Sequence, residues 1–208
     1  VRQGLSCHHH DVAFFNTQVP AALGGRIAQR RPYVVCTDIT PRQYDEMHTY
    51  YNHRADRNGV LRRYKHRVNR RLLQQAAHVL PWSSWVQASL IEDYGVEPER
   101  ITVVPPGVDT ERWQPGPKPT VERPLRILFV GGDFQRKGGD LLLDAFRMLV
   151  PGTAELVLVT RTPIAPQAGV VVRNDLTANS PELVRLYQNS DLFVLPTRAE
   201  AFGIAAAE

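Results

Sequence analysis

Short apolar runs alternate with segments of helical composition in the first half of the chain. The apolar runs are residues 11–17, 32–36, 78–80 and 101–104. The segments of helical composition are residues 18–31, 44–54, 60–78 and 84–94. Strands that are apolar on both faces and alternate with helices are typical of a parallel sheet covered on both sides. The first half therefore predicts an α/β unit that ends at the turn of Pro105, Pro106 and Gly107.

A proline-rich segment follows, and beyond it the pattern begins again. Residues 108–124 show no apolar periodicity and are typical of a linker. The next predicted strands are residues 125–130, 154–160, 169–172 and 191–195, and the predicted helices are 140–149, 181–189 and one that starts near Gly203. We therefore predict two partial α/β domains, residues 1–106 and 124–208, which the linker at 107–123 joins.

The composition narrows the class of protein. The 208 residues are 43% apolar and 22% charged, which excludes a disordered chain, and a net charge of +4 is too mild to indicate a nucleic-acid binder. No apolar run approaches the ~18–20 residues of a membrane span, and no signal-peptide pattern opens the chain. The two cysteines, Cys7 and Cys36, cannot form a disulfide framework, which favours a reducing compartment. We expect a cytoplasmic protein.

Both ends of the chain look interrupted. The first residue is Val1 rather than methionine, and residues 203–208 have the composition of a helix that has barely begun. We therefore expect a fragment of a longer protein, and every expectation about activity concerns that parent protein.

The loop after residues 125–130 has the composition of an anion site. Gly131 and Gly132 stand at the carboxyl end of this predicted strand, where ligands bind in open α/β sheets. Arg136 and Lys137 follow just before a predicted helix, and two cations beside a helix N-terminus suit a diphosphate. The spacing is neither that of a P-loop nor that of G-x-G-x-x-G. The alternative is a glycine turn with two solvated cations.

Residues 191–208 place two carboxylates around a predicted helix start. Glu200 lies in a polar loop after the strand, and Glu208 lies about one turn into the helix that starts near Gly203. A helix N-terminus suits a phosphate, and carboxylates accept hydrogen bonds from hydroxyls, so the combination suits a sugar nucleotide. The alternative is two exposed glutamates in a surface loop and helix.

Three motifs in this order and spacing resemble one enzyme family. They are Val130–Gly138 (VGGDFQRKG), Asp191–Pro196 (DLFVLP) and a Glu-x7-Glu pair at Glu200 and Glu208. Together they resemble the C-terminal half of retaining family 4 glycosyltransferases of the GT-B fold, in which two Rossmann-like domains face a cleft. Residues 101–109 resemble the segment that links the two domains. The resemblance implies transfer of a sugar from a nucleotide-diphosphate sugar to a glycan, lipid or small-molecule acceptor, with retention of anomeric configuration.

The resemblance also implies roles for single residues. Arg136 and Lys137 would neutralise the donor diphosphate as it leaves, and Glu208 would bind the ribose hydroxyls. Glu200 would contact the donor sugar near the reacting centre, so Glu200, Arg136 and Lys137 form the expected catalytic set. The expected donor-binding set also includes Gly131, Gly132, Phe202, Gly203 and Ile204. We expect neither a metal nor a cofactor, because positioning and stabilisation of leaving-group charge would drive the reaction.

Two positions depart from the family pattern. Pro106 stands where family members commonly have asparagine before the linker glycine. The family often places a His-Gly pair near the acceptor, and the comparable loop here, residues 37–41, contains Asp38 instead. We expect Asp38 to lie on the acceptor side.

Residues 54–71 are strongly basic, with seven arginines and one lysine against a single acidic residue, Asp56. Helical spacing predicts a buried face formed by Leu61, Tyr64, Val68 and Leu72. The opposite face is either a solvated helix surface or a peripheral contact with an anionic membrane. Nucleic acid is not expected as a partner, because no aromatic-interleaved strand motif supports it.

Other functions stay as alternatives. The protein could be a non-catalytic nucleotide-binding or membrane-surface protein, or another GT-B enzyme such as a sugar-phosphate synthase. Turnover of a nucleotide sugar distinguishes an enzyme from a binding protein. The histidines within residues 7–11 match no zinc-binding spacing, so we expect no metal site there. The sequence leaves the donor base, the sugar and the acceptor open.

Overall fold

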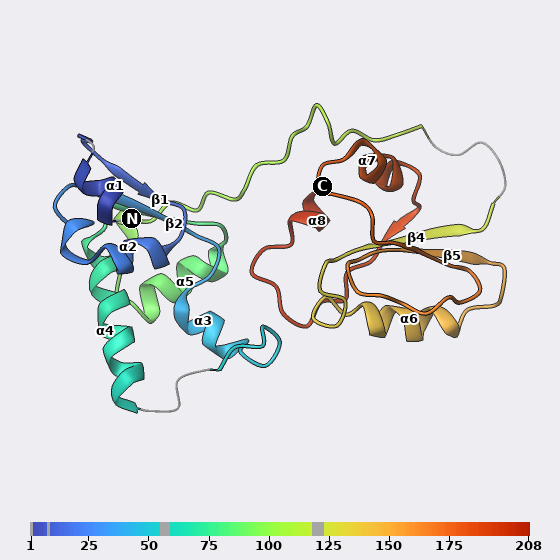
Figure 1. The fold of residues 1–208 in the computed structure, drawn as a ribbon, viewed down its shortest axis with the longest axis horizontal. Helices are drawn as coiled ribbons and strands as arrows, with labels where there is room; N and C mark the ends of the chain where they lie inside the picture. Colours follow the sequence, from blue (N-terminus) through green and yellow to red (C-terminus); the bar gives the residue numbers. More distant parts are fainter. Residues whose placement is uncertain (1, 8, 55–58, 118–122) are drawn as a thin grey trace. The chain divides into compact units, whose positions relative to one another are not determined.

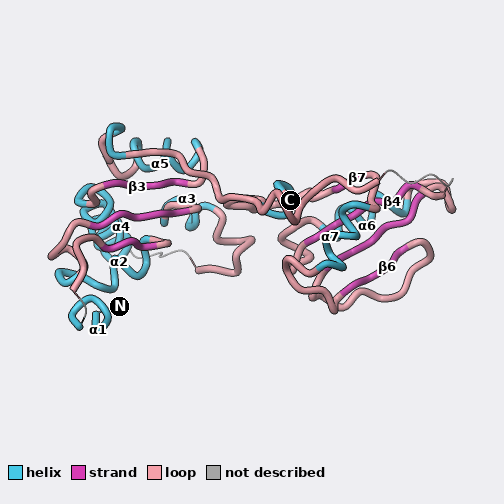
Figure 2. Tube along the Cα trace, turned by 90° about the horizontal axis from the view of Figure 1, so that it is seen from above, coloured by secondary structure: helices cyan, strands magenta, loops and turns pink. Residues whose placement is uncertain are grey.

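The computed structural model describes residues 2–7, 9–54, 59–117 and 123–208. Its contacts divide the chain into two compact units, residues 1–106 and 107–208. Each unit contains one sheet, and all strands of both sheets are parallel (Figures 1 and 2). The two separate parallel sheets confirm the predicted α/β class.

The first unit is built on a three-stranded sheet with the strand order β1-β2-β3. The strands are β1 (Ala13–Phe15), β2 (Tyr33–Thr37) and β3 (His78–Pro81). The helices are α1 (Arg2–Cys7), α2 (Gln18–Gly24), α3 (Pro41–Glu46), α4 (Gly59–Gln75) and α5 (Ser84–Glu92), with single turns η1 (Gly25–Ile27) and η2 (Pro98–Arg100). Fully buried side chains such as Val35, Val79 and Leu90 fill the core of this unit.

Two helices of the first unit differ from their predicted ranges. The helix predicted at 18–31 is shorter in the structure: α2 ends at Gly24, because Gly25 adopts a positive φ of 56° that interrupts the helix. The helix predicted at 44–54 begins earlier and is shorter. The side chains of Thr40 and Gln43 each accept a hydrogen bond from the other residue's backbone amide. This capping box makes α3 begin at Pro41.

The strand predicted at residues 101–104 is wrong in extent. Only one bridge joins it to the sheet, between Val79 and Ile101. The amide of Val104 does donate to the carbonyl of Pro81, at 2.9 Å. Pro81 has no amide hydrogen with which to return a bond, so the ladder cannot continue.

The second unit is built on a four-stranded sheet with the strand order β6-β5-β4-β7. The strands are β4 (Leu125–Val130), β5 (Ala154–Val159), β6 (Val170–Arg173) and β7 (Leu192–Phe193). The helices are α6 (Gly139–Arg147), α7 (Pro181–Gln188) and α8 (Ile204–Ala207).

The sheet of the second unit buries apolar side chains on both faces. Phe129 packs into a cluster with Leu142 of α6, whereas its neighbour Leu128 packs into a separate cluster with Leu183 of α7. Figure 1 shows α6 and α7 on opposite sides of β4 and β5. This arrangement confirms that the strands are covered on both sides, as their uniformly apolar character predicts.

The described part of the predicted linker lies with the second unit. The ring of Trp113 packs edge-on against Tyr187 of α7, with 5.0 Å between the ring centroids. The side chain of Gln188 donates to the carbonyl of Gln114 at 3.0 Å. Residues 113 and 114 are thereby fixed on α7. None of the helices within the described residues is both long and apolar enough to cross a membrane.

Candidate functional site

Two loops meet at the carboxyl edge of the second sheet. They are the donor loop, residues 131–138, and the glutamate loop, residues 194–203, which follow β4 and β7. These strands are parallel neighbours, so both loops leave the sheet at the same edge, where ligands bind in open α/β folds. The amide of Arg198 donates to the carbonyl of Arg136 at 2.9 Å, which joins the loops directly.

Glycine residues allow this close approach. Gly138 has a φ of +75°, and a Cβ at this position would collide with the carbonyl oxygen of Pro196. Only glycine combines that backbone conformation with that contact. Gly131 is also closely packed, because a Cβ there would lie 3.0 Å from the Cβ of Lys137. Gly132, by contrast, has no atom within 4 Å of an added Cβ and leaves its backbone open.

The structure brings Arg136, Lys137 and Glu200 into one cluster. The ammonium group of Lys137 forms an ion pair and hydrogen bond with the carboxylate of Glu200, and only 15% and 19% of the two side chains are exposed. The guanidinium of Arg136 donates to the carbonyl of Ala199 at 2.9 Å and lies 3.4 Å from the carboxylate of Asp133. Both cations are thereby held at the edge of the sheet, largely shielded from water.

A second ion pair fastens the glutamate loop to α6. Both terminal nitrogens of Arg198 donate to the carboxylate of Asp140, at 2.6 and 2.8 Å. The same guanidinium donates to the carbonyl of Gln135 at 2.6 Å. The hydrogen bonds from Arg198 hold the pKa of Asp140 below its ordinary value. The sequence reasoning missed this pair, because 58 residues separate its members.

The backbone predicted to meet sugar and phosphate lies at the start of α8. Phe202 and Gly203 precede this helix and Ile204 begins it, which confirms a helix start at Gly203. No side chain caps the helix, and its four residues form a single turn. An added Cβ at Gly203 would lie 3.8 Å from the Cγ of Glu200, so the two positions are neighbours.

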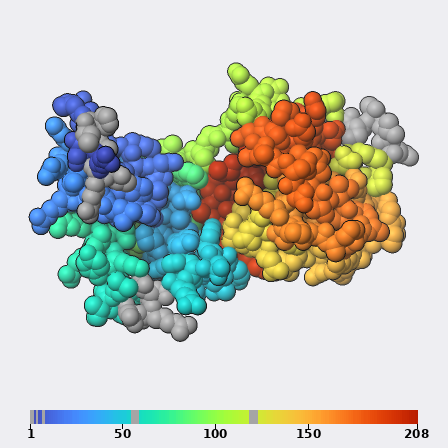
Figure 3. Space-filling view, in the orientation of Figure 1, coloured from blue at the N-terminus to red at the C-terminus, as the bar shows by residue number. Residues whose placement is uncertain are grey.

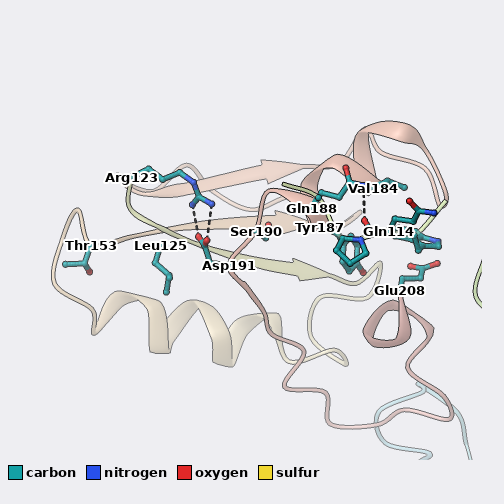
Figure 4. A pocket seen from close by; sticks show the side chains of 13 residues that line it. Gln114, Arg123, Leu125, Thr153, Val184, Tyr187, Gln188, Ser190, Asp191 and Glu208 are labelled. Carbon is teal, nitrogen blue, oxygen red and sulfur yellow. Dashed lines mark hydrogen bonds and ion pairs between the residues drawn. The ribbon is translucent and has the colours of Figure 1, made fainter. Parts of the chain in front are cut away.

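Glu208 lines an open pocket of about 1030 Å³ beside α7 (Figure 4). No residue of the donor loop lines this pocket. Tyr187 and Trp113 form part of its wall, and the hydroxyl of Tyr187 donates to the carbonyl of Ala205 at 2.7 Å. Burial raises the pKa of the Glu208 carboxyl. Burial, and next the charge of Glu208, raise the pKa of Tyr187. Sequence reasoning missed both aromatic residues. The local signal for Trp113 is an aromatic side chain within a proline-rich segment, and Tyr187 of α7 has no comparable signal.

Asp38 lies in the first unit, directly after β2. Buried polar side chains hold its loop in place. The hydroxyl of Thr37 hydrogen-bonds to Gln18 at 2.8 Å, and the hydroxyls of Thr40 and Ser89 hydrogen-bond to each other at 2.8 Å. Among the described residues the carboxylate of Asp38 has no such partner.

The expectation that the protein needs no metal stays a prediction. Within the described ranges, no three His, Cys, Asp or Glu side chains gather as a metal-binding group. One of the histidines of the 7–11 run, His8, lies outside the described residues.

Two family models together match most of the chain. The model of Glycosyltransferase Family 4 matches residues 1–112. The model of Glycosyl transferases group 1 matches residues 124–208. Each match covers one of the two sheets.

Curated relatives are identical to the chain at about a third of the matched positions. D-inositol 3-phosphate glycosyltransferase of Thermobispora bispora is 34% identical over 146 residues, which are 57% of this chain and 34% of that protein. The protein of the same name from Acidothermus cellulolyticus is 32% identical over 161 residues, which are 64% of this chain and 36% of that protein. The chain thus spans about a third of the length of the curated relatives it matches.

Solved structures show the same fold. Anabaena Alr3699/HepE in complex with UDP-glucose aligns with a TM-score of 0.67 at 20% identity, covering 98% of this chain and 58% of that chain. Sucrose-phosphate synthase from Thermosynechococcus elongatus aligns with a TM-score of 0.69 at 15% identity, covering 99% of this chain and 55% of that chain. These likenesses confirm the predicted GT-B fold. Because the family 4 model alone spans more than half of its residues, the chain belongs to glycosyltransferase family 4.

Proposed function

We propose that the protein containing this chain transfers a sugar from a nucleotide-diphosphate sugar to an acceptor hydroxyl, with retention of anomeric configuration. The cluster of Arg136, Lys137 and Glu200 is the observation that carries this proposal. Family membership supports the activity, and the curated relatives are named as D-inositol 3-phosphate glycosyltransferases. A solved structure with the same fold holds UDP-glucose, which supports a nucleotide-sugar donor.

The donor diphosphate would bind over the donor loop. Arg136 and Lys137 offer it two charge-assisted hydrogen bonds, each of which contributes about 1.5–3 kcal/mol. Both side chains are mostly shielded from water, so their charges are less screened than those of surface lysines and arginines. The open backbone at Gly132 lets a bulky anion approach closely.

Transfer would proceed by positioning and charge neutralisation. As the bond between the sugar C1 and the diphosphate oxygen breaks, negative charge grows on the diphosphate, where Arg136 and Lys137 neutralise it. The acceptor oxygen bonds to C1 on the same face and gives its proton to the departing diphosphate. Glu200 accepts hydrogen bonds from the donor sugar and orients it, without acting as a nucleophile. In this proposal the two cations take the place that a metal ion would otherwise have.

The nucleoside would lie toward α8. Glu208 can accept hydrogen bonds from both ribose hydroxyls, and the backbone of Phe202, Gly203 and Ile204 can contact sugar and phosphate. On the acceptor side, the carboxylate of Asp38, which has no partner within the described ranges, can accept a hydrogen bond from a hydroxyl of a glycan, lipid or small molecule. The buried free thiol of Cys36 is consistent with the cytoplasmic location that we propose.

The test uses the full-length protein with UDP-, GDP- and ADP-linked sugars. We expect one of these donors to release its nucleoside diphosphate in the presence of acceptor, and NMR of the product to show the anomeric configuration of the donor. Lys137→Ala should weaken nucleoside-diphosphate binding by about one to two orders of magnitude, since about 1.4 kcal/mol corresponds to tenfold.

Arg147→Ala is the matched control. Arg147 belongs to α6 in the same unit, its side chain is 56% exposed, and it lies outside both loops. Its removal should leave nucleotide binding unchanged. Nucleotide binding without turnover of any donor would instead identify a non-catalytic binding protein, and an inverted product would overturn retention alone.

A further inference from the structure

Helix α4 does not bury the face that its sequence predicts. Leu72 is buried and Val68 is half-buried, as expected. Leu61 and Tyr64, however, are 44% and 64% exposed, and Val60 is 73% exposed. The prediction of a continuous buried face is therefore wrong for the amino-terminal half of the helix. Figure 1 shows this half extending away from the sheet of the first unit.

The three exposed apolar residues form one patch. At 100° per residue, Val60, Leu61 and Tyr64 fall within about 100° of the helix circumference. We call them the α4 patch. Single exposed apolar side chains are ordinary, but neighbouring ones on one helix face mark an interaction surface. In Figure 3 the helix (turquoise) is open at the surface of the first unit.

Cations lie along one side of the α4 patch. Helix α4 contains six lysines and arginines and no acidic residue. Arg63, Arg67 and Arg71 follow at successive i, i+4 positions along one side of the patch, and all three are exposed. Among the described residues, no carboxylate pairs with them. Like charges at this spacing repel each other, so the free chain gains no stability from the arrangement.

An anionic lipid surface fits both features. Arginines beside an exposed apolar stripe that contains tyrosine are typical of helices that lie in the headgroup region, with their cations on lipid phosphates. A nucleic acid would match the charge but would give no place to Val60 and Leu61. We propose that the amino-terminal half of α4 docks the protein on anionic membranes, with the α4 patch among the headgroups.

The test is flotation of the full-length protein with lipid vesicles. We expect binding to vesicles that contain phosphatidylglycerol and little binding to pure phosphatidylcholine. Raising the salt from about 0.1 to 1 M, which shortens the Debye length from ~10 to ~3 Å, should remove most of the binding. Equal binding to both vesicle types would overturn the proposal.

Paired variants separate the two contributions. Arg63→Gln/Arg67→Gln should weaken vesicle binding about 25-fold, from about fivefold for each cation near the surface. Arg112→Gln/Arg185→Gln, which removes two exposed cations of the second unit, is the matched control and should change little. Leu61→Ser/Tyr64→Ser should weaken binding about tenfold through lost apolar contact. Equal effects of the two arginine pairs would contradict the proposal.

Thermal unfolding of the Leu61→Ser/Tyr64→Ser variant tests whether another part of the full-length protein buries the α4 patch. If the α4 patch is exposed in the full-length protein, Leu61→Ser/Tyr64→Ser should leave Tm within about 2 °C, as surface substitutions do. A large drop in Tm, or failure to fold, would show that another part of the protein buries the patch, and the proposal would fall. Binding of RNA in place of vesicles would also overturn it. None of these variants should alter nucleotide binding, so the outcome is independent of the proposed enzymatic function.

Discussion

Replacing Glu200 with glutamine should tighten the binding of a nucleoside diphosphate while it reduces turnover. In the structure, the carboxylate of Glu200 forms an ion pair with the ammonium group of Lys137, and less than a fifth of either side chain is exposed. A diphosphate that approaches the donor loop must therefore compete with a carboxylate for its cation. Glutamine keeps the shape of the side chain but removes the charge.

The size of the effect follows from the hydrogen bond that is released. A hydrogen bond between charged groups contributes about 1.5–3 kcal/mol. The ammonium of Lys137 has three donors and can keep part of its bond to the amide oxygen of Gln, so we expect about half to two thirds of this range, or roughly 1–2 kcal/mol. The affinity for UDP, or for whichever nucleoside diphosphate binds, should rise about 5- to 30-fold.

Isothermal titration calorimetry of four full-length proteins measures this effect. They are the wild type, Glu200→Gln, Lys137→Ala and the double variant. The part of the gain that passes through Lys137 should disappear in the Lys137→Ala background, where only the direct repulsion between Glu200 and the diphosphate is relieved. The cycle should therefore show a coupling of about 1 kcal/mol between the two residues.

Glu182→Gln is the control for loss of a negative charge. Glu182 lies exposed in the first turn of α7, outside both loops. Its replacement should leave UDP binding unchanged. The reasoning fails if Glu200→Gln weakens UDP binding, or if the gain is equally large with and without Lys137.

Three further predictions concern stability. Gly138→Ala should destabilise the fold by about 3 kcal/mol or more, because the left-handed backbone strains any Cβ and the Cβ would collide with Pro196. Gly132→Ala, where nothing would touch the Cβ, should change the free energy of unfolding by less than about 0.5 kcal/mol. Thermal melts compare the two variants. Burial raises the pKa of Glu208, so the folded state binds the proton of this carboxyl more tightly than the unfolded state. The free energy of unfolding should therefore fall as pH rises above the ordinary pKa of 4.5. Urea titrations at successive pH values measure this dependence, which Glu208→Gln should remove. Tyr187→Phe should cost about 1 kcal/mol through loss of its hydrogen bond to Ala205, measured in the same titrations.

Local sequence patterns predicted most of the second unit. The runs that form β4 and β5 are mostly apolar and mostly buried, and such runs are typical of a parallel sheet that is covered on both sides. The place of the 131–138 loop was predictable for a similar reason, since Gly131 directly follows β4 and the two cations lie in the same loop. Position along a strand thus predicts which loops lie together, because the carboxyl ends of parallel strands share one edge.

Contacts between distant segments could not be predicted in this way. The bond of Arg198 to Asp140 and the contact of Gly138 with Pro196 each join residues about 58 apart in the chain. Neither pair carries a periodic signal. The spacing of Leu61 and Tyr64 did carry a periodic signal, but the burial that it predicted is wrong. Helical spacing predicts that an apolar face exists and does not show what covers that face.

The charges of the two units differ in a way that fits two kinds of partner. In the second unit the cations of the site are paired and shielded, as Lys137 is with Glu200. A small anion can replace such a carboxylate as the partner of the cation, so that the cation does not stay buried alone. In α4, Arg63, Arg67 and Arg71 are exposed and have no carboxylate partner among the described residues. Exposed cations gain little from a single anion in water, so only a surface that presents many anions at once would bind them tightly.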